Sequence, residues 1–288
     1  NRIGGCSMLN EEKIKELKKF AINIRIESMK AFGNLGFGHV GGSFSIADTL
    51  AVLYGDVMKV DPKNPKWEDR DWLISSKGHA GPAIYAALAL KGYFPLEVLM
   101  TLNKPGTRLP SHCDKNLTVG VDMTTGSLGQ GSSLAVGVAL GHKLDRRNNY
   151  TYLILGDGEL QEGQIWEAAS YAAHAGLDNL IAFVDYNKKQ LDGFLVDINK
   201  PFSISGKFTS FGWHAQDIDG HNVESIYNAI EEAKRIKGKP SVIVLDTIKG
   251  KGWKYCETAA SNHHVTVSKE QMEEAIEELK KQLEEVMI

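Results

Sequence analysis

The sequence predicts an α/β fold, in which a single domain has a mainly parallel sheet flanked by helices. Three short apolar segments have the composition of buried parallel strands, and they occupy residues 151–155, 180–187 and 241–247. Helical spacing of apolar residues covers 162–175 between the first two strands and 223–236 before the third. Because strands that alternate with helices are typical of βαβ units, we expect these strands to be parallel.

The remaining elements follow from spacing and capping. Asn10 is expected to cap an amphipathic helix that runs from Glu11 to about Asn34. Residues 193–220 are expected to be rich in loops and to form part of the wall of a crevice. The charge pattern of the last helix indicates a solvated face, with docking of a partner as the alternative. The other predicted helices are 46–53, 82–91, 134–144 and 269–285, and a short strand is predicted at 72–74.

Length and composition indicate an enzyme-sized globular domain. A chain of 288 residues can bury about three-quarters of its unfolded surface in one compact fold. A net charge of −3 without a basic stripe argues against a nucleic-acid partner. No apolar run approaches the roughly 20 residues that cross a bilayer, and three unpatterned cysteines fit a reducing compartment, so we expect no membrane association and a cytoplasmic location.

The first seven residues differ from the rest. NRIGGCS, residues 1–7, precedes Met8 and lacks the apolar centre of a signal peptide. We interpret it as a remnant of protein expression and expect the domain to span residues 8–288.

Two oxygen-bearing side chains follow neighbouring predicted strands. Asp157, between Gly156 and Gly158, comes directly after the first strand, and Asn187 ends the second strand 30 residues later. The carboxyl ends of neighbouring parallel strands open onto one crevice, and Mg²⁺ selects hard oxygens together with phosphate oxygens. The two glycines allow close approach of a diphosphate, and a helix start favours its charge. An ordinary turn and a strand cap are the alternative, but this spacing favours a metal and diphosphate site.

Three histidines lie in loops marked by glycine or proline. They are His39 in GHVGGSFS, His79 in SSKGHA and His112 in LPSHCD. Convergent loop histidines suit polar, sugar-like substrates and proton transfer near neutral pH. A zinc site is a weak alternative, because no CxxC, HxxxH or HExxH spacing occurs. The histidines interpreted as structural are His142, His174, His214 and His221.

These segments together resemble a known family. GDG, followed about thirty residues later by VDYN, resembles the thiamine diphosphate motif, and the chain from about Ile14 to His263 resembles the N-terminal, diphosphate-binding half of transketolase. The resemblance implies the thiamine diphosphate-binding fold. The segments that carry it, besides the GDG unit, are GHVGGSFS (38–45), DRDWLISSKGHA (69–80), LPSHCD (109–114), DMTTGSLGQGSSLAVGVALG (122–141) and TIKGKGWKYCETAASNHH (247–264).

The resemblance implies a set of site residues. The implied metal ligands are Asp157, the side chain of Asn187 and the backbone carbonyl of Lys189, where the family more often has a small or apolar residue. They would hold Mg²⁺, for which Ca²⁺ or Mn²⁺ can substitute. His264 is the rival of His263, because the glycine that usually follows this histidine is missing. The implied cofactor contacts are His79, Gly126, Ser127, Leu128, Gly156, Asp157, Gly158 (through its N–H), Glu159, Asn187 and His263. The implied catalytic, substrate-facing residues are His39, His79, His112 and His263.

Glu162, in the string LQEG, has two interpretations. An acidic side chain in a first helical turn complements the helix dipole. In the family, the corresponding glutamate lies at a subunit interface and links two cofactor sites, and the match of the whole string favours this role.

The implied activity is that of a thiamine diphosphate- and Mg²⁺-dependent transketolase, which transfers a two-carbon ketol unit from a ketose or ketose phosphate to an aldose. Whole transketolases carry two further domains, so we expect an N-terminal subunit that is active only with a separate C-terminal, pyrimidine-binding subunit, in an α2β2 assembly. The alternatives are a split relative with a donor outside the pentose phosphates, another thiamine diphosphate enzyme, or a non-catalytic scaffold. The loop LPSHCD departs from the pentose-phosphate pattern and keeps the first alternative open.

Overall fold

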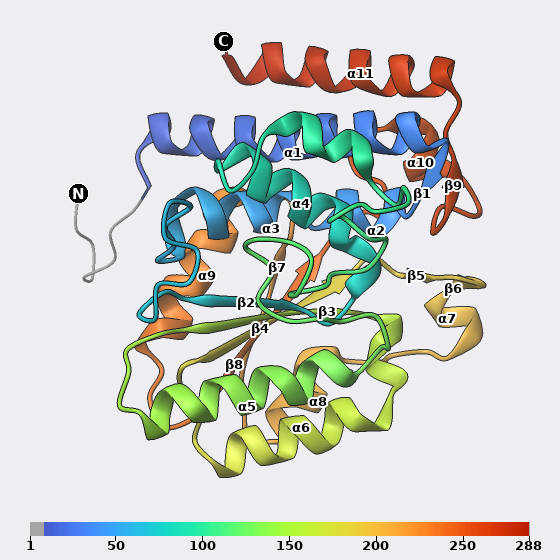
Figure 1. Ribbon diagram of the computed structural model, residues 1–288. Helices are drawn as coiled ribbons and strands as arrows, with labels where there is room; N and C mark the ends of the chain where they lie inside the picture. The colour runs from blue at the N-terminus through green and yellow to red at the C-terminus, as the bar shows by residue number, and fades with distance from the viewer. Residues whose placement is uncertain (1–8, 288) are drawn as a thin grey trace.

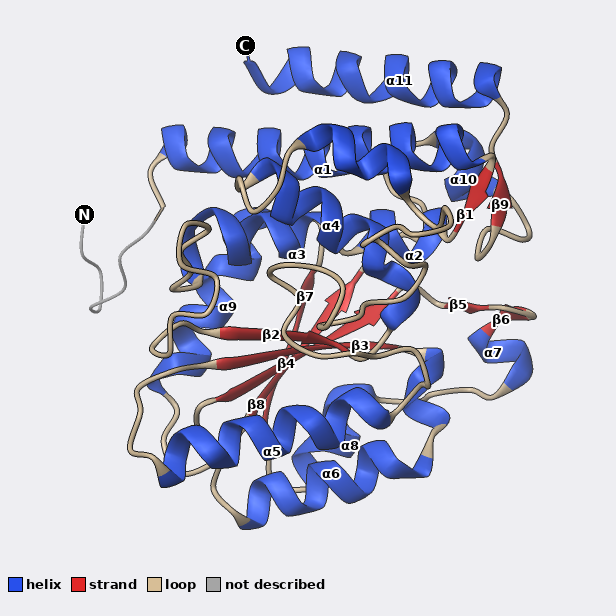
Figure 2. Cartoon of the chain, viewed as in Figure 1, coloured by secondary structure: helices blue, strands red, loops and turns tan. Residues whose placement is uncertain are grey.

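Five parallel strands form the centre of the computed structural model, which describes residues 9–287 (Figures 1 and 2). The interpretation of residues 1–7 as an expression remnant therefore lies outside the described residues. In spatial order the strands are β2 (Trp72–Ser75), β3 (Thr151–Gly156), β4 (Leu180–Tyr186), β8 (Ser241–Asp246) and β7 (His214–Asp219). Two short antiparallel ribbons lie outside this sheet: β1 (Phe37–Gly38) with β9 (Val265–Thr266), and β5 (Lys189–Gln190) with β6 (Gly193–Phe194).

Helices cover both faces of the sheet, as Figures 1 and 2 show. The lower layer in this view contains α5 (Gln130–Leu144), α6 (Gly163–His174) and α8 (Ile204–Ser210). The upper layer contains α1 (Glu11–Leu35), α2 (Val40–Ser45), α3 (Ala47–Val52), α4 (Gly81–Leu90) and α9 (Val223–Arg235). The last helix, α11 (Lys269–Met287), packs along α1, and the shorter helices are α7 (Leu195–Ile198) and α10 (Lys254–Thr258). A π-helical turn occupies Leu53–Val57, and short 3₁₀ helices occupy Gly78–Ala80, Leu96–Thr101 and Gly158–Gln161.

The strands are apolar throughout because each supplies side chains to two cores. Ile154 and Phe183 point into the core under α1, α3 and α4, whereas Leu155 and Val184 join the core over α5 and α6. Burial of both faces is the property that continuous apolar strands predict. The α/β class and the parallel sheet are therefore confirmed.

The ends of the first helix follow the predicted chemistry. The side chain of Asn10 accepts a hydrogen bond from the N–H of Lys13 (2.8 Å), so the predicted cap is confirmed. Gly36 ends the helix at φ 93°, a left-handed conformation that favours glycine. This ending directs the chain into β1 and on to His39.

One regional prediction is wrong. The sequence predicts mostly loop for residues 193–220, but they contain α8 and β7, the edge strand of the sheet. β7 has the sequence HAQDID, and none of its residues is fully buried. Because an edge strand is partly exposed, it does not need the apolar composition by which the inner strands were predicted. In addition, α5 begins at Gln130, four residues before the predicted start, directly after Gly129 at φ 85°.

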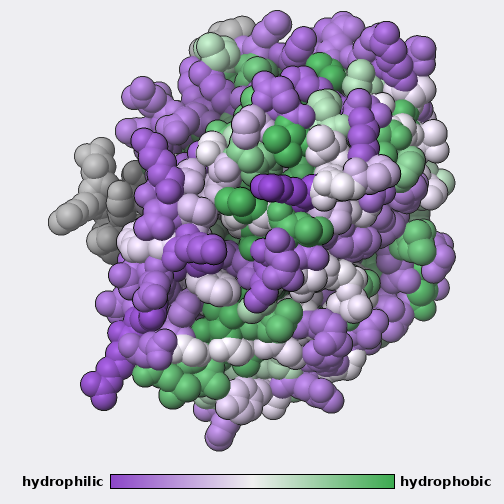
Figure 3. Space-filling view, in the orientation of Figure 1, coloured by the Kyte–Doolittle hydropathy of each residue, from purple (hydrophilic) through white to green (hydrophobic). Residues whose placement is uncertain are grey.

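The surface around α11 is strongly hydrophilic, which Figure 3 shows along the top of the molecule. This agrees with the solvated face predicted for the last helix. Within residues 9–287, no helix is both long enough and apolar enough to span a bilayer.

Candidate functional site

A cavity of about 400 Å³ opens at the carboxyl ends of β2, β3 and β4. All but one of the predicted site residues line it, and the exception is Ser127. Its walls come from segments far apart in the chain, which the parallel sheet gathers at one edge. The lining consists of His39, Gly42, Lys77, His79, His112, Gly126, Leu128, Gly156, Asp157, Gly158, Glu159, Gln161, Glu162, Asn187, Lys189, Gln190, Leu191, Lys249 and His263.

Strand register brings Asp157 close to Asn187. Gly156 of β3 pairs with Asp185 of β4, so the two strands end side by side. Asp157 is 3% exposed, and its carboxylate accepts hydrogen bonds from the N–H groups of Gly158 (2.8 Å) and Lys188 (2.6 Å). The Gly158 N–H, which the resemblance assigns to a diphosphate, is thus bound to Asp157 here. Burial, followed by the charge of Asp185, raises the pKa of Asp157 to about 7.

A buried ion pair fixes Asn187. The Asp185 carboxylate accepts from the Lys77 ammonium (2.5 Å) and from the side-chain N–H of Asn187 (2.9 Å). Burial alone would raise the pKa of Asp185, but the Lys77 charge outweighs it and holds the pKa below its usual value. Because the amide nitrogen of Asn187 is committed to Asp185, its carbonyl oxygen faces the loop, where it accepts from the Lys189 N–H (3.2 Å).

The donor set fits a hard divalent cation. A buried carboxylate on Asp157, an oriented amide oxygen on Asn187 and a backbone carbonyl on Lys189 are the oxygen types that Mg²⁺ prefers. A cation would also favour the ionised form of a carboxyl group whose pKa is raised by burial.

Lys249 reaches the same place, which sequence reasoning did not foresee. Its ammonium donates to the Lys189 carbonyl (2.8 Å) and lies 3.3 Å from Nδ1 of His263. Burial, followed by the nearby Lys77 charge, lowers the pKa of Lys249 to about 8. Its charge is therefore available near neutral pH to face an anionic ligand.

Glu159 stabilises one wall of the cavity through hydrogen bonds to three segments. One oxygen atom accepts from the Ser76 hydroxyl and the Gly129 N–H (2.8 Å), and the other accepts from the Gly156 N–H (2.9 Å). The carboxylate thus ties together the loops after β2 and β3 and the start of α5. It lines the cavity, but all of these hydrogen bonds are made within the protein.

Four predicted histidines face one another across the cavity. The ring centre of His39 lies 5.5 Å from that of His79, 5.7 Å from that of His112 and 5.3 Å from that of His263. Burial is the first cause that lowers the pKa of all four, to about 4 for His39 and about 3 for His263. Neutral imidazoles therefore line the cavity at pH 7, each with one donor and one acceptor nitrogen.

The structure distinguishes His263 from its neighbour. Both rings lie close to that of His39, at 5.3 Å for His263 and 5.0 Å for His264. However, His263 lines the cavity beside Lys249, whereas His264 contacts the ring of Phe37 (5.2 Å) and does not line the cavity. The geometry therefore favours the register that assigns the site role to His263.

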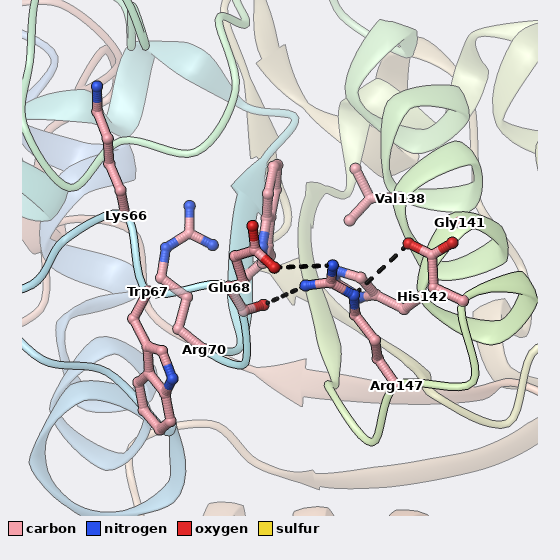
Figure 4. A pocket seen from close by; sticks show the side chains of 10 residues that line it. Lys66, Trp67, Glu68, Arg70, Val138, Gly141, His142 and Arg147 are labelled. Atoms are coloured by element: carbon pink, nitrogen blue, oxygen red, sulfur yellow. Dashed lines mark hydrogen bonds and ion pairs between the residues drawn. The ribbon is translucent and has the colours of Figure 1, made fainter.

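A second hollow lies near the amino end of β2 and is drawn in Figure 4. Its two arginines already have acidic partners. Arg147 bonds Glu68 (3.1 Å), as Figure 4 shows. Arg70 bonds Asp122 (2.6 Å), which does not line the hollow. His142, which the sequence indicates to be structural, lines this hollow and not the cavity described above. Because its two arginines are paired with carboxylates and it lies at the amino ends of the strands, away from the cavity described above, the hollow is a weaker candidate.

Sequence reasoning missed the charged residues beneath the histidines: Lys77, Asp185 and Lys249. A signal was present for the first two. Asp185 interrupts an otherwise apolar strand, and Lys77 lies between buried segments in SSKGHA. A charge at such a position requires a partner or a function.

Comparisons with known proteins agree with this site. The family model described as "Transketolase, thiamine diphosphate binding domain" matches residues 17–285. The 6-deoxy-6-sulfo-D-fructose transketolase subunit SqwG of Clostridium sp. (strain MSTE9) is 55% identical over 274 residues, which are 95% of this chain and 99% of that protein. An apulose-4-phosphate transketolase subunit of Phocaeicola vulgatus is 37% identical, with coverage of 86% of this chain and 88% of that protein.

Longer transketolases match only in part. Transketolase 1 of Escherichia coli is 39% identical over 82% of this chain, but over 37% of its own length. The crystal structure of transketolase from Campylobacter jejuni superposes with a TM-score of 0.86 and 32% identity, covering 94% of this chain and 43% of that one. The chain thus spans less than half of these two proteins, but nearly all of the relatives named as subunits. These similarities confirm the resemblance drawn from the sequence.

Proposed function

Because this chain belongs to the transketolase family, we propose that it is the N-terminal subunit of a split transketolase that depends on thiamine diphosphate and Mg²⁺. The observation that carries the proposal is the cavity in which Asp157 and Asn187 lie beneath His39, His79 and His263. A hard-oxygen site next to uncharged hydrogen-bonding side chains suits a metal-bound diphosphate beside a polyhydroxylated substrate.

The sheet edge would hold the cofactor. Asp157, Asn187 and the Lys189 carbonyl would ligate Mg²⁺. The Lys249 ammonium, which donates to that carbonyl here (2.8 Å), would give up this hydrogen bond to the cation and balance the remaining diphosphate charge. When bound, thiamine diphosphate supplies a nucleophilic ring carbon that accepts a two-carbon unit from a ketose. Gly126, Leu128 and Gly156 line the same wall and would form the surface on which the cofactor rests.

The histidines would bind the sugar. His39, His79, His112 and His263 come from separate segments and can each donate one hydrogen bond and accept another. Their lowered pKa values keep them uncharged, so they bind hydroxyl groups without repelling a cationic cofactor ring.

For the donor we propose 6-deoxy-6-sulfo-D-fructose. Support comes from the 55% identity to a subunit named for that sugar, compared with 37% for the subunit named for apulose 4-phosphate. The loop LPSHCD around His112 also departs from the pentose-phosphate pattern. Fructose 6-phosphate and apulose 4-phosphate are the comparison donors.

The partner would be a separate C-terminal subunit that carries the pyrimidine-binding half, in an α2β2 assembly. Support comes from relatives named as subunits and from the partial coverage of longer transketolases. Glu162 lines the cavity with an exposed side chain, which suits the proposed contact between cofactor sites at an interface.

We also propose that residues 8–288 form one diphosphate-binding domain. The enzyme is proposed to be cytoplasmic, since Cys113 and Cys256 are buried free thiols.

The test is calorimetric titration of thiamine diphosphate, with and without Mg²⁺, into this chain alone and into its mixture with the C-terminal subunit. Metal-dependent binding in the mixture, followed by turnover of the sulfonated ketose, is the expected result. Absence of binding in every mixture would reject the proposal and favour a scaffold, and turnover of another ketose alone would reject the donor.

A further inference from the structure

We propose that His221 is a positioning residue, which fixes Lys249 in the cavity through the backbone of Ile248. The inference rests on the proposed function, since it assigns Lys249 to the cofactor diphosphate. His221 itself lies outside the cavity, in the turn between β7 and α9. It connects the outer helical layer to the loop that follows β8.

A buried ion pair holds His221 from one side. Arg25 of α1 bonds the Asp48 carboxylate of α3 (2.5 Å), and the guanidinium also donates to the Phe44 carbonyl (3.0 Å). Nδ1 of His221 lies 2.8 Å from the same Asp48 carboxylate. The ion pair and the imidazole thus join three elements that are far apart in the sequence.

The carboxylate also fixes which ring nitrogen carries the proton. Burial alone would raise the pKa of Asp48, but Arg25 and His221 outweigh it and hold the pKa at about 2. An ionised carboxylate can only accept, so Nδ1 of His221 is the donor and Nε2 is free to accept. The Ile248 N–H donates to this Nε2 at 2.8 Å.

This hydrogen bond lies next to Lys249 in the chain. The Ile248 side chain is exposed, so apolar packing does not hold this part of the loop. Hydrogen bonds also hold the residues on either side of Ile248. The Thr247 hydroxyl donates to Asp185 (2.6 Å), the Lys249 carbonyl accepts from Asn262 (3.2 Å), and the Gly250 N–H donates to the Gly41 carbonyl (3.1 Å). His221 supplies the tie at Ile248 itself, directly before Lys249. Removing the groups that orient metal ligands typically lowers metal affinity by about 10- to 100-fold, and for a lysine that contacts the diphosphate we expect the lower end of this range.

The test compares two substitutions. His221→Leu removes both hydrogen bonds but leaves the Arg25–Asp48 pair, whereas His221→Gln keeps a donor and an acceptor on one planar group. With Mg²⁺ and the C-terminal subunit present, His221→Leu is expected to weaken thiamine diphosphate binding about tenfold. In the chain alone it is expected to speed amide exchange across residues 247–252, and His221→Gln is expected to restore most of both effects. His214→Leu, at the opposite end of β7, is the matched control and should change neither.

A double-mutant cycle separates positioning from a general loss of structure. In a Lys249→Met background, His221→Leu should cause no further loss of binding, because its effect passes through Lys249. Equal loss in both backgrounds, or unchanged exchange across 247–252, would overturn the inference. Failure of the wild-type complex to bind the cofactor would instead reject the proposed function, and the exchange data would still decide whether His221 holds the loop.

Discussion

Asp157→Asn is expected to stabilise the metal-free chain at pH 8, although it removes a proposed metal ligand. The carboxyl group of Asp157 has its pKa raised from 3.8 to about 7 by burial and by Asp185. By the linkage relation, an ionised group with this shift costs the folded state about 4 kcal/mol above pH 7. Since the folded pKa exceeds the unfolded one, stability is lost as pH rises from about 4 to about 7.

The carboxamide avoids this ionisation cost but is an imperfect acceptor. One of the two backbone N–H groups that Asp157 accepts, from Gly158 or Lys188, would face an amide NH₂, which costs about 2 kcal/mol. The net gain is therefore about 2 kcal/mol at pH 8, or about 4 °C in melting temperature. At pH 5 the ionisation cost falls to roughly 2 kcal/mol, so the gain should vanish.

Scanning calorimetry in the presence of a chelator, at pH 8 and pH 5, measures this difference. Asp192→Asn, at an exposed carboxylate near the cavity, is the matched control and should leave the melting temperature unchanged at both pH values. Added Mg²⁺ and thiamine diphosphate, with the C-terminal subunit, should stabilise the wild type but not Asp157→Asn. A variant that is less stable than the wild type at pH 8, or equally shifted at both pH values, would refute the reasoning.

Three further predictions follow from the same geometry. Gly78→Ala would place a methyl group 2.8 Å from the Gly126 N–H nitrogen, so it should displace that loop and abolish cofactor binding by calorimetry, while an unchanged affinity would show that the loop can yield. Asp185→Asn leaves the Lys77 charge buried without its partner and should cost about 3–5 kcal/mol in urea unfolding, of which Lys77→Met in the same chain should recover a part; no recovery would mean that the pair is not the cause. Nitrogen-15 NMR should find the His39 ring uncharged at pH 6, because burial lowers its pKa to about 4, and a titration midpoint near 6.5 would contradict this.

The inner strands of the sheet could be predicted from the sequence, but the edge strand β7 could not. Inner strands such as β4 are buried on both faces, so their composition identifies them, whereas β7 has a single neighbouring strand and polar side chains. For the same reason Asp157 and Asn187 could be brought together in advance, since both follow inner strands of known direction. Lys249 could not, because its place depends on a loop whose path is set by hydrogen bonds to distant segments. Spacing in the sequence carries no information on such contacts.

The oxygen-bearing residues and the histidines of the site are positioned by different kinds of structure. Asp157 and Asn187 directly follow two paired strands, β3 and β4, and the register of these strands does not depend on the length of any loop. His39 and His112, in contrast, come from loops and short helices that an insertion or deletion can reshape. An exchange of the histidine loops should therefore leave the proposed metal site undisturbed, and grafting the loop 109–114 from a relative is expected to alter donor preference while Mg²⁺ affinity stays constant. The sheet edge is thus the part of the site that depends on strand register, and the histidine loops are the part in which a change of sequence can alter the proposed substrate preference.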